Sequence, residues 1–521
     1  MPIFKNELKT VFDHGGVPSF NEFYNIGIFY WKMIYKGFLA DWHTINAPTI
    51  ANPTAKRKRN RMNYGKALCS ELANLAWAEG SSVSVNQKGW NSEEQDPLDC
   101  FIHHVLDINS FDTKMRQLIE ESFALGGATI RSFVDGQIGD DGNIIDGTQT
   151  IRLEYGRADQ FVPISWDNQR VTEGVFIEKK ARKGWYYTRL EFHRWNGEEY
   201  VVSNEVYKTK TPFTGNTSQD ILGIRSPLSE IWENMAESVS FQDLSLGLFS
   251  YFRTCMANNL DDNSPLGISI YANCADTIKA LDIAFDSLIQ EMVLGRKRII
   301  VPSSAIRKVR DSTGQEHRYF DASDEVYEAL YTDSAENLRI KDNTVELRVE
   351  EHIRAINALL DILSSQVGLS EGSLSFDSAK GMKTATEVIS ENSKTYRTVK
   401  LMQEPIRQSI ENMIHNIIDI ACAYDVEFIH DGVSYPVYDL VKKGYDISVS
   451  FDDSIIQDRN ADIQEGINLL QNKVISRRTF LIDYLKLTPE QADVEIEQIN
   501  KETKDSASAR VLDVDWSNVG A

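Results

Sequence analysis

The segment from residue 346 to residue 400 constrains the fold of this chain more than any other. It begins with a helical pattern, ELRVEEHIRAINALLDILSSQV, and continues with a loop, GLSEGSLSFDSAKGM. A second helical pattern opens with KTATEVISENSKTYRTVK. Loops this rich in Gly and Ser are uncommon between two long amphipathic helices of a compact domain. The pattern therefore predicts a loop with a function of its own rather than a simple connector.

Both flanking helices have clear sequence signals. The apolar stripe of the first helix consists of Val349, Ile353, Ile356, Leu360 and Leu363, spaced by three and four residues as on one helical face. The second helix has a capping box, with Thr384 at the cap and Glu387 three residues later. It is expected to extend to about residue 424, and Pro405 is expected to kink or divide it.

Length and net charge limit the number of modules and the kinds of binding that this chain is expected to have. A chain of 521 residues is expected to contain more than one module, because a single core rarely extends that far. The formal net charge of -22 disfavours sequence-specific nucleic-acid binding, which normally requires a basic face. An acidic surface remains compatible with a polyanion that passes by without being held.

Motifs for catalysis, cofactors or metals do not occur in the structural context that each requires. The sequence lacks GxxxxGK[ST], GxGxxG after a strand, a GxSxG nucleophile elbow after a strand, and HExxH. Its five cysteines are scattered and include no CxxC pair, so no cofactor or metal is expected. A cluster of carboxylates of the nuclease kind stays open from sequence alone. Since no apolar run reaches about 18 residues, no membrane segment is expected either.

The periodicities predict an α+β fold. Residues 1–80 and 97–125 have helical patterns, and an aromatic stretch at 20–38 is expected to pack on other helices. Residues 128–210 alternate with period two and predict an antiparallel meander. A long helix is predicted after Ser226, over about 227–252. The basic run 56–61 is interpreted as a solvated helix entry or as a contact with nucleic acid or an acidic neighbour.

The remaining segments complete the order of elements. A helix is predicted at 275–294 and a small strand-rich insert at 299–345, which is too small to have a substantial core of its own. Strands return at 426–451, helices follow, and the polar end from 506 is expected to be disordered.

Four segments, in this order, resemble the portal protein of tailed bacteriophages. They are KALCSELANLAWAEG, ISIYANCADTIKALDIAFDSLIQEM, GLSEGSLSFD and KTATEVISENSKTYRTVK. The resemblance is to the branch found in long-tailed phages and prophages of Gram-positive bacteria, and it covers roughly residues 55–500. Each segment is moderately specific, and their common order strengthens the identification.

The resemblance implies a portal fold with a mostly helical wing, stem and crown, an antiparallel β meander in the wing and a small α/β clip insert. The implied boundaries are wing 1–274, stem helix 275–298, clip 299–345, stem helix 346–366, tunnel loop 367–382, kinked helix and returning wing strands 383–455, crown 456–505 and disordered tail 506–521.

The resemblance also implies a non-enzymatic function in the virion. About twelve copies would form a homo-oligomeric ring at one capsid vertex, with heterologous contacts between neighbours. The ring would nucleate procapsid assembly and provide a channel for double-stranded DNA during packaging and ejection. The implied partners are the terminase large subunit, the head-tail adaptor, and the major capsid and scaffolding proteins, after a period in the host cytoplasm.

Candidate site residues follow from these assignments. The tunnel loop would face DNA with Lys380, Lys383, Ser375 and Ser378, and the stem would line the channel with Asp282, Asp286 and Glu291. The clip would dock terminase or adaptor through Arg307, Lys308 and Arg310. A solvated helix entry for the lysines and an ordinary exposed face for the carboxylates remain alternatives.

Two other functions stay open from the sequence. One is a metal-dependent DNA-processing enzyme of a mobile element, which would use clustered carboxylates. The other is a capsid-associated structural protein without a channel, although such a protein would not need the loop at 367–382.

Overall fold

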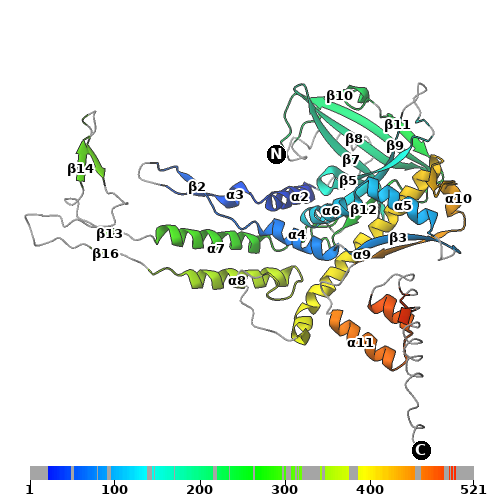
Figure 1. The fold of residues 1–521 in the computed structure, drawn as a ribbon. Coiled ribbons are helices and arrows are strands. Elements are labelled where there is room, and N and C mark those ends of the chain that lie inside the picture. Colours follow the sequence, from blue (N-terminus) through cyan, green and yellow to red (C-terminus); the bar gives the residue numbers. More distant parts are fainter. Residues whose placement is uncertain are drawn as a thin grey trace, which may run out of the picture.

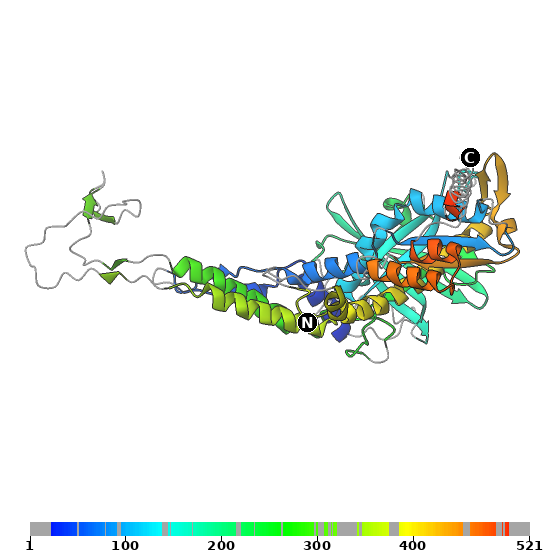
Figure 2. The ribbon, with the colours of Figure 1, turned by 60° about the horizontal axis from the view of Figure 1, so that its bottom comes forward.

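A computed structural model describes residues 22–48, 52–374 and 385–485, with several internal gaps, and scattered residues of 492–499. The gaps are 79, 91–94, 138–143, 146, 169, 215–219, 234, 262–263, 296–298, 301–306, 311–313, 315, 320–340, 343–345 and 452–458. Figures 1 and 2 show a body of sheets and helices from which two helices, α7 and α8, project to one side.

The N-terminal helices confirm the helical patterns of the sequence. They are α2 (Glu22–Tyr35), α3 (Ala40–His43), α4 (Tyr64–Ala76), α5 (Pro97–Ile108) and α6 (Phe111–Leu125). Asp96 caps α5 by accepting a 2.9 Å hydrogen bond from the Leu98 N–H, and Pro97 occupies the first turn. The aromatic stretch forms α2, in which Trp31 and Ile34 are buried in the main core.

The predicted meander is present as six successive strands. They are β4 (Gly127–Asp135), β5 (Thr150–Arg157), β6 (Phe161–Asp167), β7 (Arg170–Arg182), β8 (Trp185–Asn196) and β9 (Glu199–Thr209). They divide between two sheets, one in the order β12-β4-β5 and one in the order β10-β9-β8-β7-β6, with β11 also on β9. Neighbouring strands are antiparallel, as predicted.

The prediction of a long helix over 227–252 is wrong. This segment instead forms a 3-10 turn, η3 (Leu228–Glu230), and the strands β11 (Ser238–Phe241) and β12 (Phe249–Arg253), while β10 (Ile224–Ser226) precedes it. SVSF and FSYF alternate with the period of a strand. Their backbone groups pair with two earlier strands, β11 with β9 and β12 with β4.

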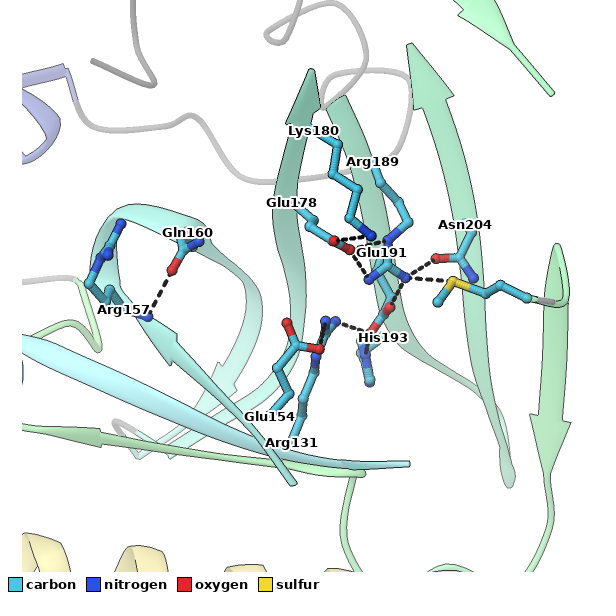
Figure 3. Close-up of polar contacts among 11 residues, drawn as sticks. Arg131, Glu154, Arg157, Gln160, Glu178, Lys180, Arg189, Glu191, His193 and Asn204 are labelled. Atoms are coloured by element: carbon cyan, nitrogen blue, oxygen red, sulfur yellow. Dashed lines mark hydrogen bonds and ion pairs between the residues drawn. The ribbon is translucent and has the colours of Figure 1, made fainter. Parts of the chain in front are cut away.

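A buried ionic network joins the two sheets (Figure 3). Arg131 of β4 pairs with Glu191 of β8 and with Glu154 of β5. Arg189 contacts Glu178 at 2.6 Å and also pairs with Glu191, although its side chain is only 2% exposed. Burial lowers the pKa of His193, whose Nε2 lies 2.9 Å from Glu191. Every buried charge here has an opposite partner, which offsets the cost of removing it from water.

Helix α9 (Ala385–Ala423) crosses the first of these sheets. It is one helix of 39 residues that continues through Pro405, so the predicted division at this proline does not occur. Its sheet-facing side is fully buried, with Ile406, Ile410, Met413, Ile414 and Ile417. The proline lacks an N–H, so the carbonyl four residues earlier loses its helical partner while packing holds the helix together.

The returning strands were expected to complete the sheet of the meander, and this prediction is wrong. β17 (Glu427–His430) and β18 (Val433–Pro436) form a hairpin, and after α10 (Val437–Val441) β19 (Tyr445–Ser450) pairs with β3 (Ser82–Gln87). This β3–β19 pair joins segments about 360 residues apart, and its buried members are Val83, Val85, Gln87 and Val449.

The other elements are short or C-terminal. The helices α11 (Arg459–Gln471) and α12 (Arg477–Thr479) and the π-helix η5 (Phe480–Tyr484) confirm helical structure in the predicted crown. The insert contains β13 (Ile299–Ile300) paired with β16 (Lys341–Asp342), and β14 (Arg307–Arg310) paired with β15 (Glu316–Tyr319). The predicted disordered tail, 506–521, lies outside the described residues. In the part that the structure describes, no helix is long and apolar enough to cross a membrane.

Candidate functional site

The two projecting helices, α7 (Ala275–Leu294) and α8 (Val349–Gln366), form an antiparallel pair. Thr277 Oγ1 donates to Gln366 Oε1 at 2.8 Å at one end, and Glu291 binds Arg348 at 3.0 Å at the other. Ile278, Leu281 and Leu288 of α7 and Ile356, Leu360 and Leu363 of α8 are buried. The helices predicted at 275–294 and from 346 are therefore present, and their assignment as a stem stays a prediction.

The carboxylates that were expected to line a channel are buried inside the chain. Asp282 and Asp286 are each only 5% exposed. Asp282 accepts hydrogen bonds from His43 Nε2 and from the Met62 N–H, both at 2.9 Å. Asp286 accepts two from Arg57, at 2.8 and 2.6 Å, and one from the Asn60 N–H at 3.0 Å. The channel-lining prediction is wrong for these two residues, because their charges are enclosed and already paired.

The partners of both carboxylates come from residues 40–62, here called the arm. The arm contains α3 and the two-stranded sheet of β1 (Thr44–Asn46) and β2 (Lys56–Lys58). Burial alone would raise the pKa of Asp286, but hydrogen bonds from Arg57 and from the Asn60 N–H outweigh it and lower that pKa. We call the contacts of the arm with Asp282 and Asp286 the clasp.

The basic run 56–61 was interpreted as a helix entry or as a surface for an external polyanion. It lies instead in β2 and the segment that follows, and Arg57 binds an acid of the same chain. His43 was not identified from the sequence. A buried histidine whose partner lies 239 residues away leaves no local pattern, since only the folded chain brings the two together.

Glu291 lies near the end of α7 and is also paired. Its hydrogen bond from Arg348 lowers the pKa of its carboxyl. The Arg348 side chain is 68% exposed and that of Glu291 is 17% exposed, so the pair sits at the surface. Exposed ion pairs of this kind add little to stability. The role of Glu291 in lining a channel stays a prediction.

The first part of the predicted tunnel loop is fixed to α9. The Ser370 N–H donates to Thr395 Oγ1 at 2.9 Å, and Thr398 Oγ1 donates to the Gly368 carbonyl at 2.6 Å. Gly368 has a positive φ of 83°, and a Cβ there would lie 2.6 Å from Thr398 Oγ1. The loop lysines and serines, Lys380, Lys383, Ser375 and Ser378, lie outside the described residues.

The predicted docking residues lie on one strand of the insert. Arg307, Lys308 and Arg310 belong to β14, and they are paired in register with Tyr319, Arg318 and Glu316 of β15. All three positions therefore lie on one strand of a hairpin, and their docking role stays a prediction.

Within the described ranges, no group of three or more His, Cys, Asp or Glu side chains could hold a metal ion. Asp282 and Asp286, which are one turn apart on α7, have cationic or N–H partners.

Comparison with known proteins bears on the whole chain. No curated protein matches it. The model of one family, described as phage portal protein, SPP1 Gp6-like, matches residues 28–509. This match includes the body, the stem pair, the insert and the C-terminal helices, and it extends over most of the 521 residues. The chain therefore belongs to the SPP1 Gp6-like family of phage portal proteins.

Proposed function

We propose that copies of this chain form a ring at one capsid vertex and that the ring is a channel for double-stranded DNA. The observation that carries the proposal is the projecting α7–α8 pair followed directly by the predicted loop, within a chain that matches the portal family over residues 28–509. A ring of about twelve copies needs one heterologous interface repeated around an axis. The paired stem helices supply a rod-like element that can pack side by side in such a ring.

The channel would act passively. The sequence contains no phosphate-binding loop, so the energy for packaging would come from a separate terminase ATPase. In this proposal Lys380 and Lys383 form a thin ring of positive charge that touches the duplex, with Ser375 and Ser378 beside them. A few phosphate contacts give weak, salt-dependent attraction that permits sliding.

The ends of the ring would bind different partners. The hairpin with Arg307, Lys308 and Arg310 would dock the terminase large subunit during packaging and the head-tail adaptor afterwards. Capsid and scaffolding proteins would contact the ring during procapsid nucleation, after synthesis in the host cytoplasm.

Mass measurement and negative-stain imaging of the purified protein test the ring. We expect an assembly of about twelve subunits with a central hole at least as wide as a DNA duplex. Monomers with magnesium-dependent nuclease activity would overturn the proposal and favour the DNA-processing alternative.

Two charge variants test the parts. Lys380→Ala with Lys383→Ala should leave ring assembly intact and change DNA packaging, whereas Lys114→Ala on α6 serves as a matched control. Failure of the loop variant to form rings would make these lysines structural. Arg307→Glu with Arg310→Glu should weaken capture of terminase or adaptor, and unchanged capture would remove the docking assignment.

A further inference from the structure

A cationic pocket lies beside the clasp. It is an open hollow of about 450 Å³ lined by Phe38, Lys58, Arg59, Asn60, Arg61 and Phe285. The charged ends of Lys58 and Arg61 lie over the Phe38 ring, at 5.7 and 5.4 Å from its centroid. We refer to it as the arm pocket.

The cations of this pocket are only partly used within the chain. Arg57 is engaged with Asp286, but Lys58 and Arg61 are exposed. The buried Nε of Arg59 has no hydrogen-bond partner among the described residues and lies 3.8 Å from Asp286. Five cations within residues 56–61 stand out in a chain of net charge -22. The chemistry of the pocket therefore calls for an acidic partner, and a second copy of this acidic chain qualifies.

The arm and α8 lie on opposite faces of α7. Asp282 binds the arm and Glu291 binds Arg348, next to α8. Nine residues separate them, which at about 100° per residue is two and a half turns. The stem therefore has three layers, with α7 between the arm and α8, consistent with the arrangement in Figure 1. A heterologous interface joins two different surfaces of the same subunit, and these two outer layers are candidates of the required kind.

Helix α8 carries an exposed acid, Glu351, at about the same height along the helix pair as the arm pocket. Glu351 is exposed, while the neighbouring Glu350 is paired with Arg354 at 3.1 Å. Counted from the nearer contact between the helices, Glu291 with Arg348, Phe285 is six residues away along α7 and Glu351 is three residues away along α8, so their levels differ by about one turn. Rotation about an axis that runs along the stem keeps this level unchanged from one subunit to the next.

We propose that the arm pocket of one subunit receives Glu351 from α8 of the neighbouring copy, so that the N-terminal arm is half of the subunit interface. The proposal rests on the ring proposed above. A recessed pocket between two aromatic rings suits a single carboxylate side chain. A duplex backbone is better contacted by protruding cations, and the pocket cations are partly held over Phe38.

Charge reversal with rescue tests the interface, and size-exclusion chromatography with light scattering reads the assembly. Lys58→Glu with Arg61→Glu should shift the protein from ring to monomer at concentrations where wild type is a ring, and Glu351→Lys should do the same. All three changes in one chain should restore the ring. Mixing the two monomeric variants should also restore it, because alternating copies pair opposite charges at every interface. Lys114→Glu on α6, a charge change of the same size as that of Glu351→Lys and of opposite sign, should leave the ring intact.

The outcomes separate this proposal from the ring itself. If wild type forms no ring, the proposed function fails. If wild type forms a ring and both reversals also do, with unchanged resistance to salt, the arm pocket is not an interface. If the reversals keep the ring but abolish DNA binding, the pocket is a phosphate site and the proposal is overturned. Circular dichroism of the monomeric variants, together with rescue on mixing, excludes misfolding as the cause of ring loss.

Discussion

Replacing Asp286 by Ala should release the arm from the stem helix. The Asp286 side chain is 7% exposed and accepts two hydrogen bonds from Arg57 and one from the Asn60 N–H. Hydrogen bonds to charged groups contribute about 1.5–3 kcal/mol each and are not additive. Because Arg57 is one-third exposed and can be resolvated, we expect a total loss of about 3 kcal/mol in the free energy that holds the arm closed. That loss corresponds to an increase of about 100-fold in arm opening.

Hydrogen–deuterium exchange of peptides from residues 40–62 measures this opening. Asp286→Ala should accelerate exchange there by about 100-fold, and Asp286→Asn should have a smaller effect because it keeps one acceptor oxygen. Asp276→Ala, at an exposed acid on the same helix, is the control. If the arm of the Asp286→Ala variant exchanged at the wild-type rate, the reasoning would be refuted, because the clasp would then contribute nothing to holding the arm closed.

The same carboxylate predicts a pH dependence. The pKa of Asp286 is lowered in the folded chain, so its contribution is complete above the ordinary carboxyl pKa of about 4 and is lost as pH falls further. Arm exchange in wild type should therefore accelerate below about pH 4, after correction for the intrinsic exchange rate.

Three further predictions concern the body. Arg189→Met should destabilise the chain by about 3–5 kcal/mol in guanidinium unfolding, because it leaves buried carboxylates without their partner; an unchanged midpoint would show that the network is not needed. Because burial lowers the pKa of His193, the unfolded chain binds more protons and stability should fall between pH 7.5 and about pH 5.5. His193→Gln should flatten that slope, and an equal slope would assign it to other groups. Gly126→Ala should cost at least about 2 kcal/mol, because φ is +92° and the new Cβ would lie 2.4 Å from the Gly267 carbonyl oxygen. Gly184→Ala, with positive φ but open space, should cost less, and equal losses would remove the steric explanation.

Elements with strong local periodicity were predictable from the sequence. The helices at 97–125 and 275–294 and the six strands from 127 to 209 all occur. The strands after Ser226 were not predictable, because LSEIWENMAESV has helix-like spacing of its apolar residues. Its strands form only because β9 and β4 offer them unpaired edges, and partners this remote do not appear in a local window.

The candidate site shows the same limit. Acids at positions 282 and 286 are one turn apart, and they were predicted to line a channel, with an ordinary exposed face as the alternative. They are buried in the structure because the arm, which lies 220–239 residues earlier in the sequence, packs on them and supplies hydrogen-bond donors. The basic run was recognisable in the sequence as an unusual feature. Its binding to Asp286 of the chain's own helix α7 was not.

Helix α9 can be regarded as a cantilever. Its C-terminal half is fixed against the β12-β4-β5 sheet by buried isoleucines from Ile406 to Ile417, while Thr395 and Thr398 nearer the other end hold the start of the loop. A 39-residue helix is about 58 Å long, so a tilt of about 5° at the clamp displaces a point 30 Å away by about 3 Å. Pro405, which removes one backbone hydrogen bond beside the clamp, lies where bending is easiest. A tilt of α9 on the β12-β4-β5 sheet would therefore move the start of the loop that Thr395 and Thr398 hold.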